Sequence, residues 1–184
     1  MPAAVKLLTI GHSTHLIERF CELLRAADVE AVADVRRYPG SRRNPQFGAA
    51  ALERSLGTGG LALVAFGTQL GGRRAHARGG VDPRTAGWRN RSFAAYAGHM
   101  ASADFDAGIA RLETLAAERR TVVMCAEADW RRCHRRLIAD ALLVRGWQPI
   151  HLLADGRREP HRLSPHAVVE GERVTYPAQP RLDV

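Results

Sequence analysis

Thr121-Val-Val-Met-Cys-Ala126 is the most convincing β-strand in the sequence. The run is apolar, carries β-branched residues and is too short for a helix, so it predicts a strand buried on both faces. A helix is expected directly after it, from Trp130 to Val144, with Asp129 as its N-cap and Gly146 beyond its end. A buried strand that leads into an amphipathic helix is the repeating unit of α/β folds.

The same pattern recurs on both sides of this stretch. Ser13 or Thr14 can cap a helix whose apolar residues begin at Leu16, and further helices are expected over 49–56, 93–100 and 104–119. Strands that alternate with helices predict an open, mostly parallel five-stranded sheet with helices on both faces. The other four predicted strands are Val5–Ile10, Val29–Val35, Leu61–Phe66 and Gln148–Leu153.

The length of 184 residues, with 46% apolar and 25% charged residues, favours a single α/β domain over residues 1–184. Residues 75–91 are rich in Arg and Gly without periodicity, so a long surface loop is expected. Residues 156–184 contain four prolines and are expected to form an irregular tail. Without a long apolar run or a secretory signal, no membrane contact is expected, and three cysteines favour reduced thiols in the cytoplasm.

Charge is the first indication of function. Lys and Arg total 27 against 19 Asp and Glu, a net charge of +8 that favours phosphate-bearing partners. Of these 27 residues 26 are Arg, a usage that the codon bias of a GC-rich genome also produces. Whether the arginines cluster in the sequence therefore has to distinguish a phosphate-binding role from codon bias. Arg36, Arg37, Arg42 and Arg43 lie close to Tyr38 and Phe47, a mixture suited to phosphate contacts and base stacking. For the arginines within 75–91, a solvated basic loop is an equally good interpretation.

Polar residues follow four of the predicted strands where each strand ends. In open α/β sheets ligands bind at the carboxyl ends of the strands, so these residues are expected to converge on one site. Each alone has a structural explanation: a helix cap, an Asp–Arg pair or a small core cysteine. The four groups are His12 with Ser13, Asp34 with Arg36, Gly71 and Gly72 with Arg73, and Cys125 with Glu127.

The densest of these segments runs from Cys125 to Arg136, from a strand end into a helix N-terminus that favours anions. Glu127 and His134 could act as acid or base there, and the helix N-terminus lowers the pKa of Cys133. A metal held by Cys125, Cys133 and His134 is the main alternative. The eight-residue separation of the cysteines matches no standard zinc spacing, and adjacent Cys133 and His134 should diverge on a helix, so no metal is predicted.

Five motifs occur in an order that resembles the family called domain of unknown function 488, from Thr9 to about Pro165. The resemblance implies an α/β fold and the same motif residues as the site, but it supplies no reaction. The motifs are Thr9-Ile-Gly-His-Ser13, Asp34-Val-Arg-Arg37, Ser41-Arg-Arg-Asn-Pro-Gln-Phe47, Leu70-Gly-Gly-Arg73, and Met124-Cys-Ala-Glu127 followed by Cys133-His-Arg135.

The first functional hypothesis is an enzyme that acts on nucleic acid or a nucleotide. His12, Asp34 and Glu127 are the predicted catalytic residues, and N-glycosidic cleavage of a modified or damaged base, without metal or cofactor, fits them best. The predicted substrate- or phosphate-binding residues are Ser13, Arg36, Arg42, Arg43, Asn44, Phe47, Gly71, Gly72, Arg73, Cys125, Cys133, His134 and Arg135.

Two other classes of function stay open. A thiol-based enzyme or redox sensor would use Cys125 and Cys133, and it requires an accessible Cys133 with a lowered pKa. A non-catalytic nucleic-acid-binding module would bind with steep salt dependence and would tolerate loss of His12 and Glu127.

Overall fold

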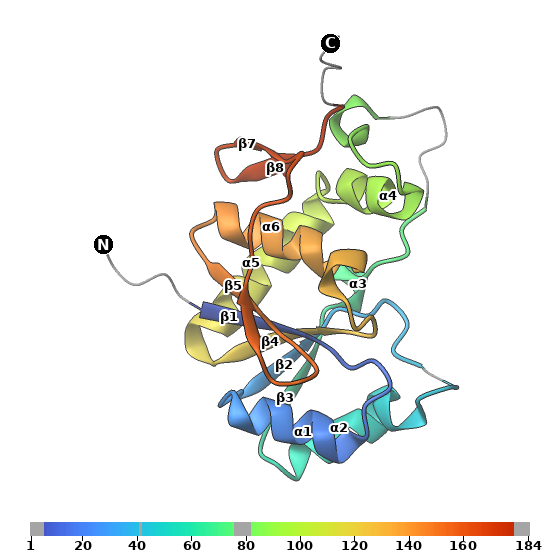
Figure 1. Cartoon of the computed structure of the whole chain (residues 1–184), viewed down its shortest axis with the longest axis vertical. Coiled ribbons are helices and arrows are strands. Elements are labelled where there is room, and N and C mark those ends of the chain that lie inside the picture. The colour runs from blue at the N-terminus through green and yellow to red at the C-terminus, as the bar shows by residue number, and fades with distance from the viewer. Residues whose placement is uncertain (1–5, 41, 76–81, 179–184) are drawn as a thin grey trace.

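A six-stranded sheet in the order β3-β2-β4-β1-β5-β6 forms the centre of the computed structural model, which describes residues 6–40, 42–75 and 82–178 (Figure 1). The five strands predicted from the sequence are all present and parallel, and β6 runs antiparallel to β5 at one edge. The strands are β1 (Lys6–Gly11), β2 (Ala31–Asp34), β3 (Ala62–Ala65), β4 (Thr121–Cys125), β5 (Gln148–Leu152) and β6 (Arg158–Pro160).

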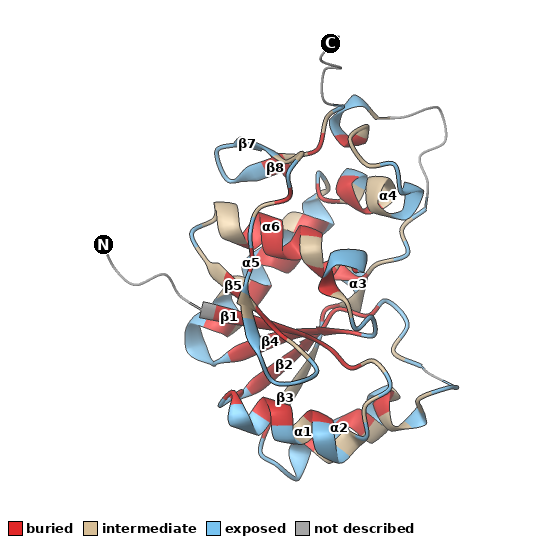
Figure 2. Ribbon diagram, in the orientation of Figure 1, coloured by how far each residue is buried: buried red, intermediate tan, exposed pale blue. Residues whose placement is uncertain are grey.

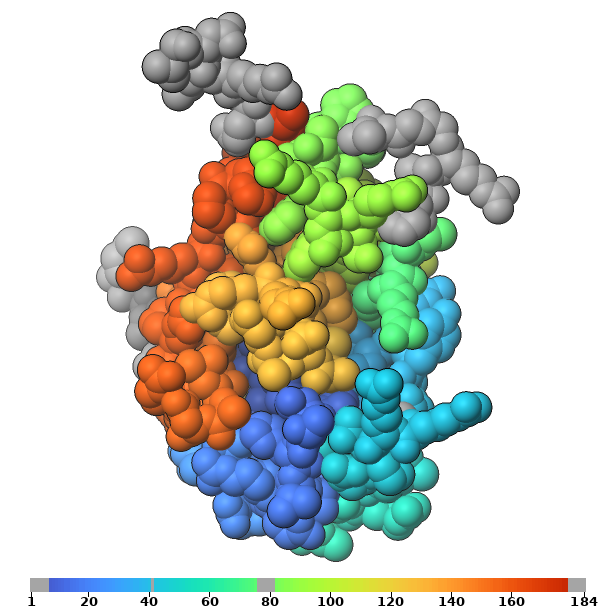
Figure 3. All heavy atoms as spheres, turned by 45° about the vertical axis from the view of Figure 1, so that its right-hand side comes forward, coloured from blue at the N-terminus to red at the C-terminus, as the bar shows by residue number. Residues whose placement is uncertain are grey.

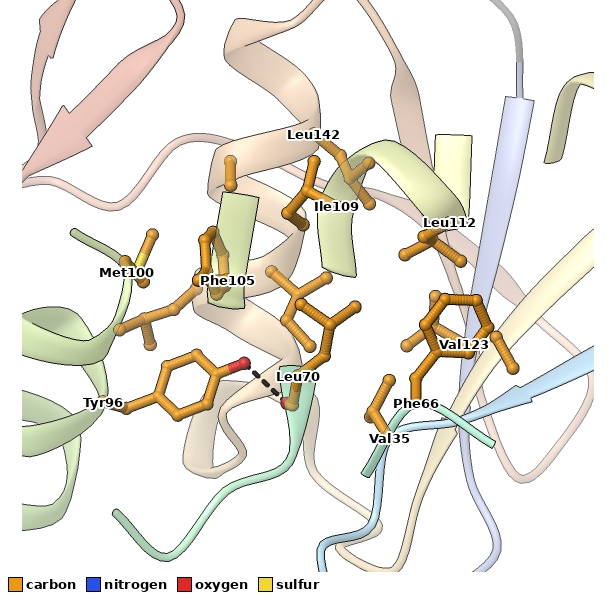
Figure 4. Close-up of a cluster of buried hydrophobic side chains, with 14 of the residues drawn as sticks. Val35, Phe66, Leu70, Tyr96, Met100, Phe105, Ile109, Leu112, Val123 and Leu142 are labelled. Atoms are coloured by element: carbon orange, nitrogen blue, oxygen red, sulfur yellow. Dashed lines mark hydrogen bonds between the residues drawn. The ribbon is translucent and has the colours of Figure 1, made fainter. Parts of the chain in front are cut away.

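Helices cover both faces of the sheet, as predicted (Figure 1). Alternate residues of β4 point to opposite faces, so Val122 joins the cluster under α1 and α2 while Val123 joins the cluster under α3 to α6. Figure 4 shows Ile109, Leu112 and Val123 in that second cluster. The helices are α1 (Ile17–Ala26), α2 (Ala49–Gly57), α3 (Gly67–Leu70), α4 (Arg91–His99), α5 (Ala103–Glu118) and α6 (Arg135–Val144).

Burial explains why the central strands read as continuous apolar runs. Every residue of β2 and β4 is buried, and Figure 2 shows these strands in red between partly exposed helices. In a sheet covered on both sides neither face of a central strand meets water, so no polar alternation appears in its sequence.

The helix expected over Trp130–Val144 is divided in two. Asp129 caps a short 3₁₀-helix, η3 (Trp130–Arg132), by accepting a hydrogen bond from the Arg131 N–H, and α6 begins only at Arg135. Cys133 lies between them with an extended backbone (φ −118°, ψ 147°). The first predicted cap is also wrong, since Leu16 is the N-cap of α1 and Ser13 adopts a left-handed backbone with φ 48°.

The two segments expected to be irregular contain regular structure. Residues 76–81 of the predicted loop lie outside the described residues, while 3₁₀-helix η2 (Pro83–Thr85) and the start of α4 fall inside it. Of the tail expected over 156–184, residues 179–184 lie outside the described residues, and the rest contains β6 and the hairpin of β7 (Val168–Glu170) and β8 (Arg173–Thr175). Strands of three residues are too short to show a period of two, which is why the sequence predicted five strands rather than six.

None of the helices in the described ranges is both long and apolar enough to cross a bilayer.

Candidate functional site

A hollow of about 500 Å³ opens at the carboxyl ends of β2 and β4. The chain leaves β2 towards β3 and leaves β4 towards β5, in opposite directions along the sheet, and such switch points form crevices in open α/β folds. In Figure 3 the chain after β4 (yellow-orange) reaches the surface between the α4 region (green) and the N-terminal part (blue and cyan). The lining residues are Arg36, Arg37, Tyr38, Gly40, Gly72, Arg73, Asn90, Ser92, Phe93, Tyr96, Cys125, Ala126, Glu127, Arg132, Cys133 and His134.

Cys125, Cys133 and His134 form a compact cluster in the wall of this pocket. The Nδ1 atom of His134 lies 3.8 Å from Cys125 Sγ and 3.7 Å from Cys133 Sγ, and all three atoms lie within 4.8 Å of one another. The expectation that Cys133 and His134 diverge is therefore wrong. Its premise fails because Cys133 is extended rather than helical, which turns its side chain towards that of the next residue.

The orientation of the His134 ring is fixed from two sides. Its Nε2 atom lies 3.2 Å from the carbonyl oxygen of Val35, which can only accept, so Nε2 carries a hydrogen. Nδ1 then faces the sulfurs, where it accepts a thiol proton when neutral and donates to a thiolate once it has taken that proton. A Cβ atom on Gly72 would lie 2.9 Å from His134 Nδ1, so glycine is needed for the close approach of this ring.

Arg135 is a buried cation next to the cluster. The side chain is 1% exposed and donates from Nε to Cys133 Sγ (3.4 Å), from Nη1 to Thr9 Oγ1 (3.5 Å) and from Nη2 to the Glu127 carbonyl oxygen. No carboxylate of the described part of the chain lies within ion-pair distance of it. Because a buried charge requires a counter-charge, the neighbouring sulfur is its available anion.

The two thiols of the cluster have opposite pKa shifts. Burial acts to raise the pKa of Cys133, but hydrogen bonds with Cys125 and His134 and the positive charges of His134 and Arg135 outweigh it and hold the pKa well below its ordinary value. The hydrogen bond to Cys133 and then burial raise the pKa of Cys125. The pair thus favours a single thiolate, located on Cys133.

His12, Asp34 and Arg36 form a second, closed network. The Asp34 carboxylate accepts from the Arg36 backbone N–H (3.0 Å), Nε (2.8 Å) and Nη2 (2.6 Å), while Nη1 donates to the Phe47 carbonyl oxygen. His12 donates from Nδ1 to the Ser13 carbonyl oxygen and presents Nε2 to Arg36 at 3.3 Å. Burial lowers the pKa of His12 to about 4, so its ring is a neutral acceptor stacked on Phe47.

The structure separates the predicted site residues into two groups. Nine of them do not line the pocket: the four buried side chains of His12, Asp34, Phe47 and Arg135, together with Ser13, Arg42, Arg43, Asn44 and Gly71. Those on its wall are Arg36, Gly72, Arg73, Cys125, Glu127, Cys133 and His134.

Sequence reasoning also missed part of the wall. Arg37 and Tyr38 belong to the arginine–aromatic cluster that the sequence analysis singled out, although they were not among the predicted site residues. Arg132 belongs to the segment after β4, whose pattern could have identified it. Asn90, Ser92 and Phe93 come from the N-cap and first turn of α4, at the junction of the loop predicted over 75–91 and the helix predicted over 93–100. No local pattern brings this helix to the ends of β2 and β4.

The wall is predominantly positive. Arg37, Arg73 and Arg132 form no salt bridge with any described residue, and Glu127 is the one carboxylate among the described lining residues. Tyr38 is 65% exposed beside them. The Arg37 guanidinium donates from Nε to the Tyr38 hydroxyl (3.4 Å) and lies over its ring. The pocket wall thus combines guanidinium groups that have no carboxylate partner, an exposed aromatic ring, and the sulfur and imidazole groups of the cluster.

One comparison with known proteins gave a match. A family model described as "Domain of unknown function DUF488" matches residues 16–142, a span that contains four of the five motifs and leaves out Thr9–Ser13. No curated protein and no solved structure matches the chain.

Proposed function

This chain belongs to the DUF488 family, and from that premise we propose that it is an enzyme acting on a nucleotide unit, free or within a nucleic acid, bound in the pocket at the carboxyl ends of β2 and β4. The family description assigns no reaction, so the chemistry has to come from the pocket. Its volume of about 500 Å³ lies within the range of small-molecule sites.

The observation that carries the proposal is the combination of unpaired arginines and aromatic rings on one wall. Arg37, Arg73 and Arg132 present guanidinium groups that suit bidentate phosphate contacts. Tyr38, which is exposed, and Phe93, which is stacked on Trp88 on one side, add aromatic rings against which a base can pack. A pocket that combines phosphate donors and stacking faces fits a nucleotide better than a purely apolar or purely anionic ligand.

Glu127 is the proposed acid–base residue. Hydrolysis of an N-glycosidic bond requires a carboxylate that activates water or stabilises an oxocarbenium-like centre, and Glu127 lines the pocket. Asp34 shared this role in the sequence hypothesis, but Arg36 occupies its carboxylate oxygens. His12 and Asp34 therefore act as positioning residues for Arg36 in the proposal, and the N-glycosidic bond is the first bond to test.

The test compares wild-type protein with Glu127→Gln on single-stranded and duplex DNA and RNA that carry modified bases, and on free nucleotides. We expect Glu127→Gln to bind with unchanged affinity and to lose turnover by about 100-fold or more. Strand breaks that appear only after alkali treatment indicate base excision. Glu53→Gln, on the exposed side of α2, is the matched control and should keep full activity. If the protein binds these substrates but turns over none of them, the enzyme hypothesis is rejected in favour of a non-catalytic binding module.

A thiol-based enzyme is the second candidate, favoured by the contacts of Cys133 with His134 Nδ1 (3.7 Å) and Arg135 Nε (3.4 Å). It predicts that Cys133→Ser abolishes turnover while Cys21→Ser does not. It further predicts that metal-free protein retains full activity and that one equivalent of an alkylating reagent on Cys133 removes it.

A further inference from the structure

We propose that Cys125 Sγ, Cys133 Sγ and His134 Nδ1 bind one zinc ion, with the fourth coordination position open to the pocket. The binding site itself stands on the geometry of these side chains. Only the role given below to the metal rests on the proposed function.

The two sulfur–nitrogen separations in the cluster are close to those of a tetrahedral site. A sulfur at about 2.3 Å and a nitrogen at about 2.0 Å from the same tetrahedral zinc ion lie about 3.5 Å apart. The observed separations from His134 Nδ1 are 3.8 Å to Cys125 Sγ and 3.7 Å to Cys133 Sγ. The two sulfurs lie within 4.8 Å of each other, against about 3.8 Å for two sulfurs bound to one tetrahedral zinc ion. Binding therefore requires the two thiols to approach each other by at most about 1 Å, which rotation of the cysteine side chains can supply.

The groups around the cluster support metal ligation as well. A ligating histidine normally donates its other ring N–H to a carbonyl or carboxylate, and His134 Nε2 is placed to donate to Val35. Arg135 Nε donates to Cys133 Sγ, a contact that suits a metal-bound thiolate. Gly72 leaves room for the ring, so the orientation of His134 is built into the wall.

The ligands come from separate elements of the fold, which explains why their spacing resembles no zinc finger. Cys125 ends β4, Cys133 follows η3 and His134 is the N-cap of α6. Zinc sites with three protein ligands and an open position are the catalytic kind, whereas structural sites are closed by a fourth residue. All three residues line the pocket, and no fourth His, Cys, Asp or Glu among the described residues joins their group, which favours a hydrolytic metal site.

In the proposed reaction a water molecule occupies the open position. Zinc lowers the pKa of such a water to about 7. The water gives one proton to Glu127, its oxygen bonds to the electrophilic carbon of the nucleotide unit, and the bond to the leaving group breaks with its electron pair. The leaving group then takes the proton from Glu127, so no oxidant, reductant or further reactant is needed.

Metal content is the first measurement. Full-length protein purified after expression with zinc is expected to contain one zinc ion per chain by elemental analysis. Cys125→Ser, Cys133→Ser and His134→Asn should each lower zinc affinity by more than about 100-fold, beyond the effect of losing an outer-shell partner. Cys21→Ser removes a thiol on α1, away from the cluster, and should leave the stoichiometry unchanged.

A second measurement avoids variants that fail to fold. Chelator-treated wild-type protein is titrated with Co²⁺, and tetrahedral binding to two thiolates should give intense visible bands and a sulfur-to-cobalt charge-transfer band that zinc then removes. A wild-type protein that takes up neither ion, or a Cys21→Ser variant that loses metal as completely as Cys133→Ser, would overturn the proposal.

The two proposals can fail separately. Stoichiometric zinc without turnover on any nucleotide or nucleic acid supports the metal site and rejects the proposed function. Full turnover by protein shown to be metal-free supports the proposed function and overturns the catalytic metal site.

Discussion

Asp34 and Arg36 form a buried ion pair across a single intervening residue, with 2.6 Å between Asp34 Oδ2 and Arg36 Nη2. The intervening residue is Val35, whose carbonyl oxygen lies 3.2 Å from His134 Nε2. The pair thus holds the peptide unit that orients the imidazole on the pocket wall. The motif that suggested catalytic groups in the sequence therefore also contacts, through Val35, a side chain from a distant part of the chain.

Replacing Asp34 should affect stability first. In Asp34→Asn the Arg36 guanidinium stays buried without its counter-charge, which is expected to lower the free energy of unfolding by about 3–5 kcal/mol. Urea denaturation measures the change. Asp28→Asn is the control, because Asp28 pairs with Arg120 at the surface, is 78% exposed in its side chain, and should change stability little. If Asp34→Asn instead keeps the stability of the wild type and loses all activity, Asp34 is a catalytic residue rather than a positioning residue.

The sequence predicted the strands well because their signal is local. The apolar run of β4 and the helical spacing of α1 and α5 do not depend on distant residues, and their bounds agree with the structure within a few positions. Parallel topology alone predicted that polar residues converge at the carboxyl ends of β2 and β4. It did not predict which of their side chains face the pocket.

The composition of the pocket wall depended on features without a local signal. The extended backbone of Cys133, which turns its thiol towards His134, interrupts an otherwise helical pattern and could not be read from residue types. The wall formed by Asn90 and Phe93 depends on how α4 packs over the sheet. The pairing of Asp34 with Arg36 is local and was one of the interpretations of the sequence, but the burial of both side chains depends on the elements that pack over them.

Stability should fall in acid because of His151. Burial, followed by the positive charges of His161, Arg135 and Arg131, lowers the pKa of His151 to about 2. The unfolded chain protonates this residue below pH of about 6.5 while the folded protein does not, so the unfolded state gains protons and stability drops as the pH falls. The contribution is about 1.4 kcal/mol per pH unit between roughly pH 6 and pH 4.

His151→Gln tests this contribution, because glutamine can hydrogen-bond to Thr9 and His161 but cannot titrate. Free energies of unfolding from urea titrations across this pH range should decline less steeply in the variant, by about 1.4 kcal/mol per pH unit. Parallel curves for the two proteins would show that His151 protonates equally in the folded and unfolded states.

Gly72→Ala should disturb the cluster with little effect on the core. The new Cβ would lie 2.9 Å from His134 Nδ1 and 3.2 Å from Cε1, so the ring must leave the position in which Nδ1 faces the sulfurs at 3.7–3.8 Å. We expect zinc affinity to fall by about 10- to 100-fold, as for loss of an orienting contact, measured by competition with a chromophoric chelator. Gly40→Ala is the control, because Gly40 lines the same pocket and nothing lies within 4 Å of the added Cβ. This variant should bind zinc as tightly as the wild type does. Equal affinities in both variants would mean that the position of His134 does not determine metal binding.

The unpaired arginines should determine how nucleic-acid binding depends on salt. Each phosphate contact to a single strand adds about 0.7 to the slope of log K against log salt, because binding releases condensed counterions. Arg132→Gln removes an exposed guanidinium from the pocket wall, so the slope should fall by about 0.7 and affinity should drop for every sequence alike. Arg25→Gln is the control, because it removes the same charge from α1, outside the pocket. It distinguishes the loss of a phosphate contact in the pocket from a general effect of lowering the net charge of +8. Fluorescence anisotropy with a labelled oligonucleotide at several salt concentrations gives both slopes. If the two variants lower the slope equally, binding is a property of the whole basic surface and the pocket is not where the phosphates lie.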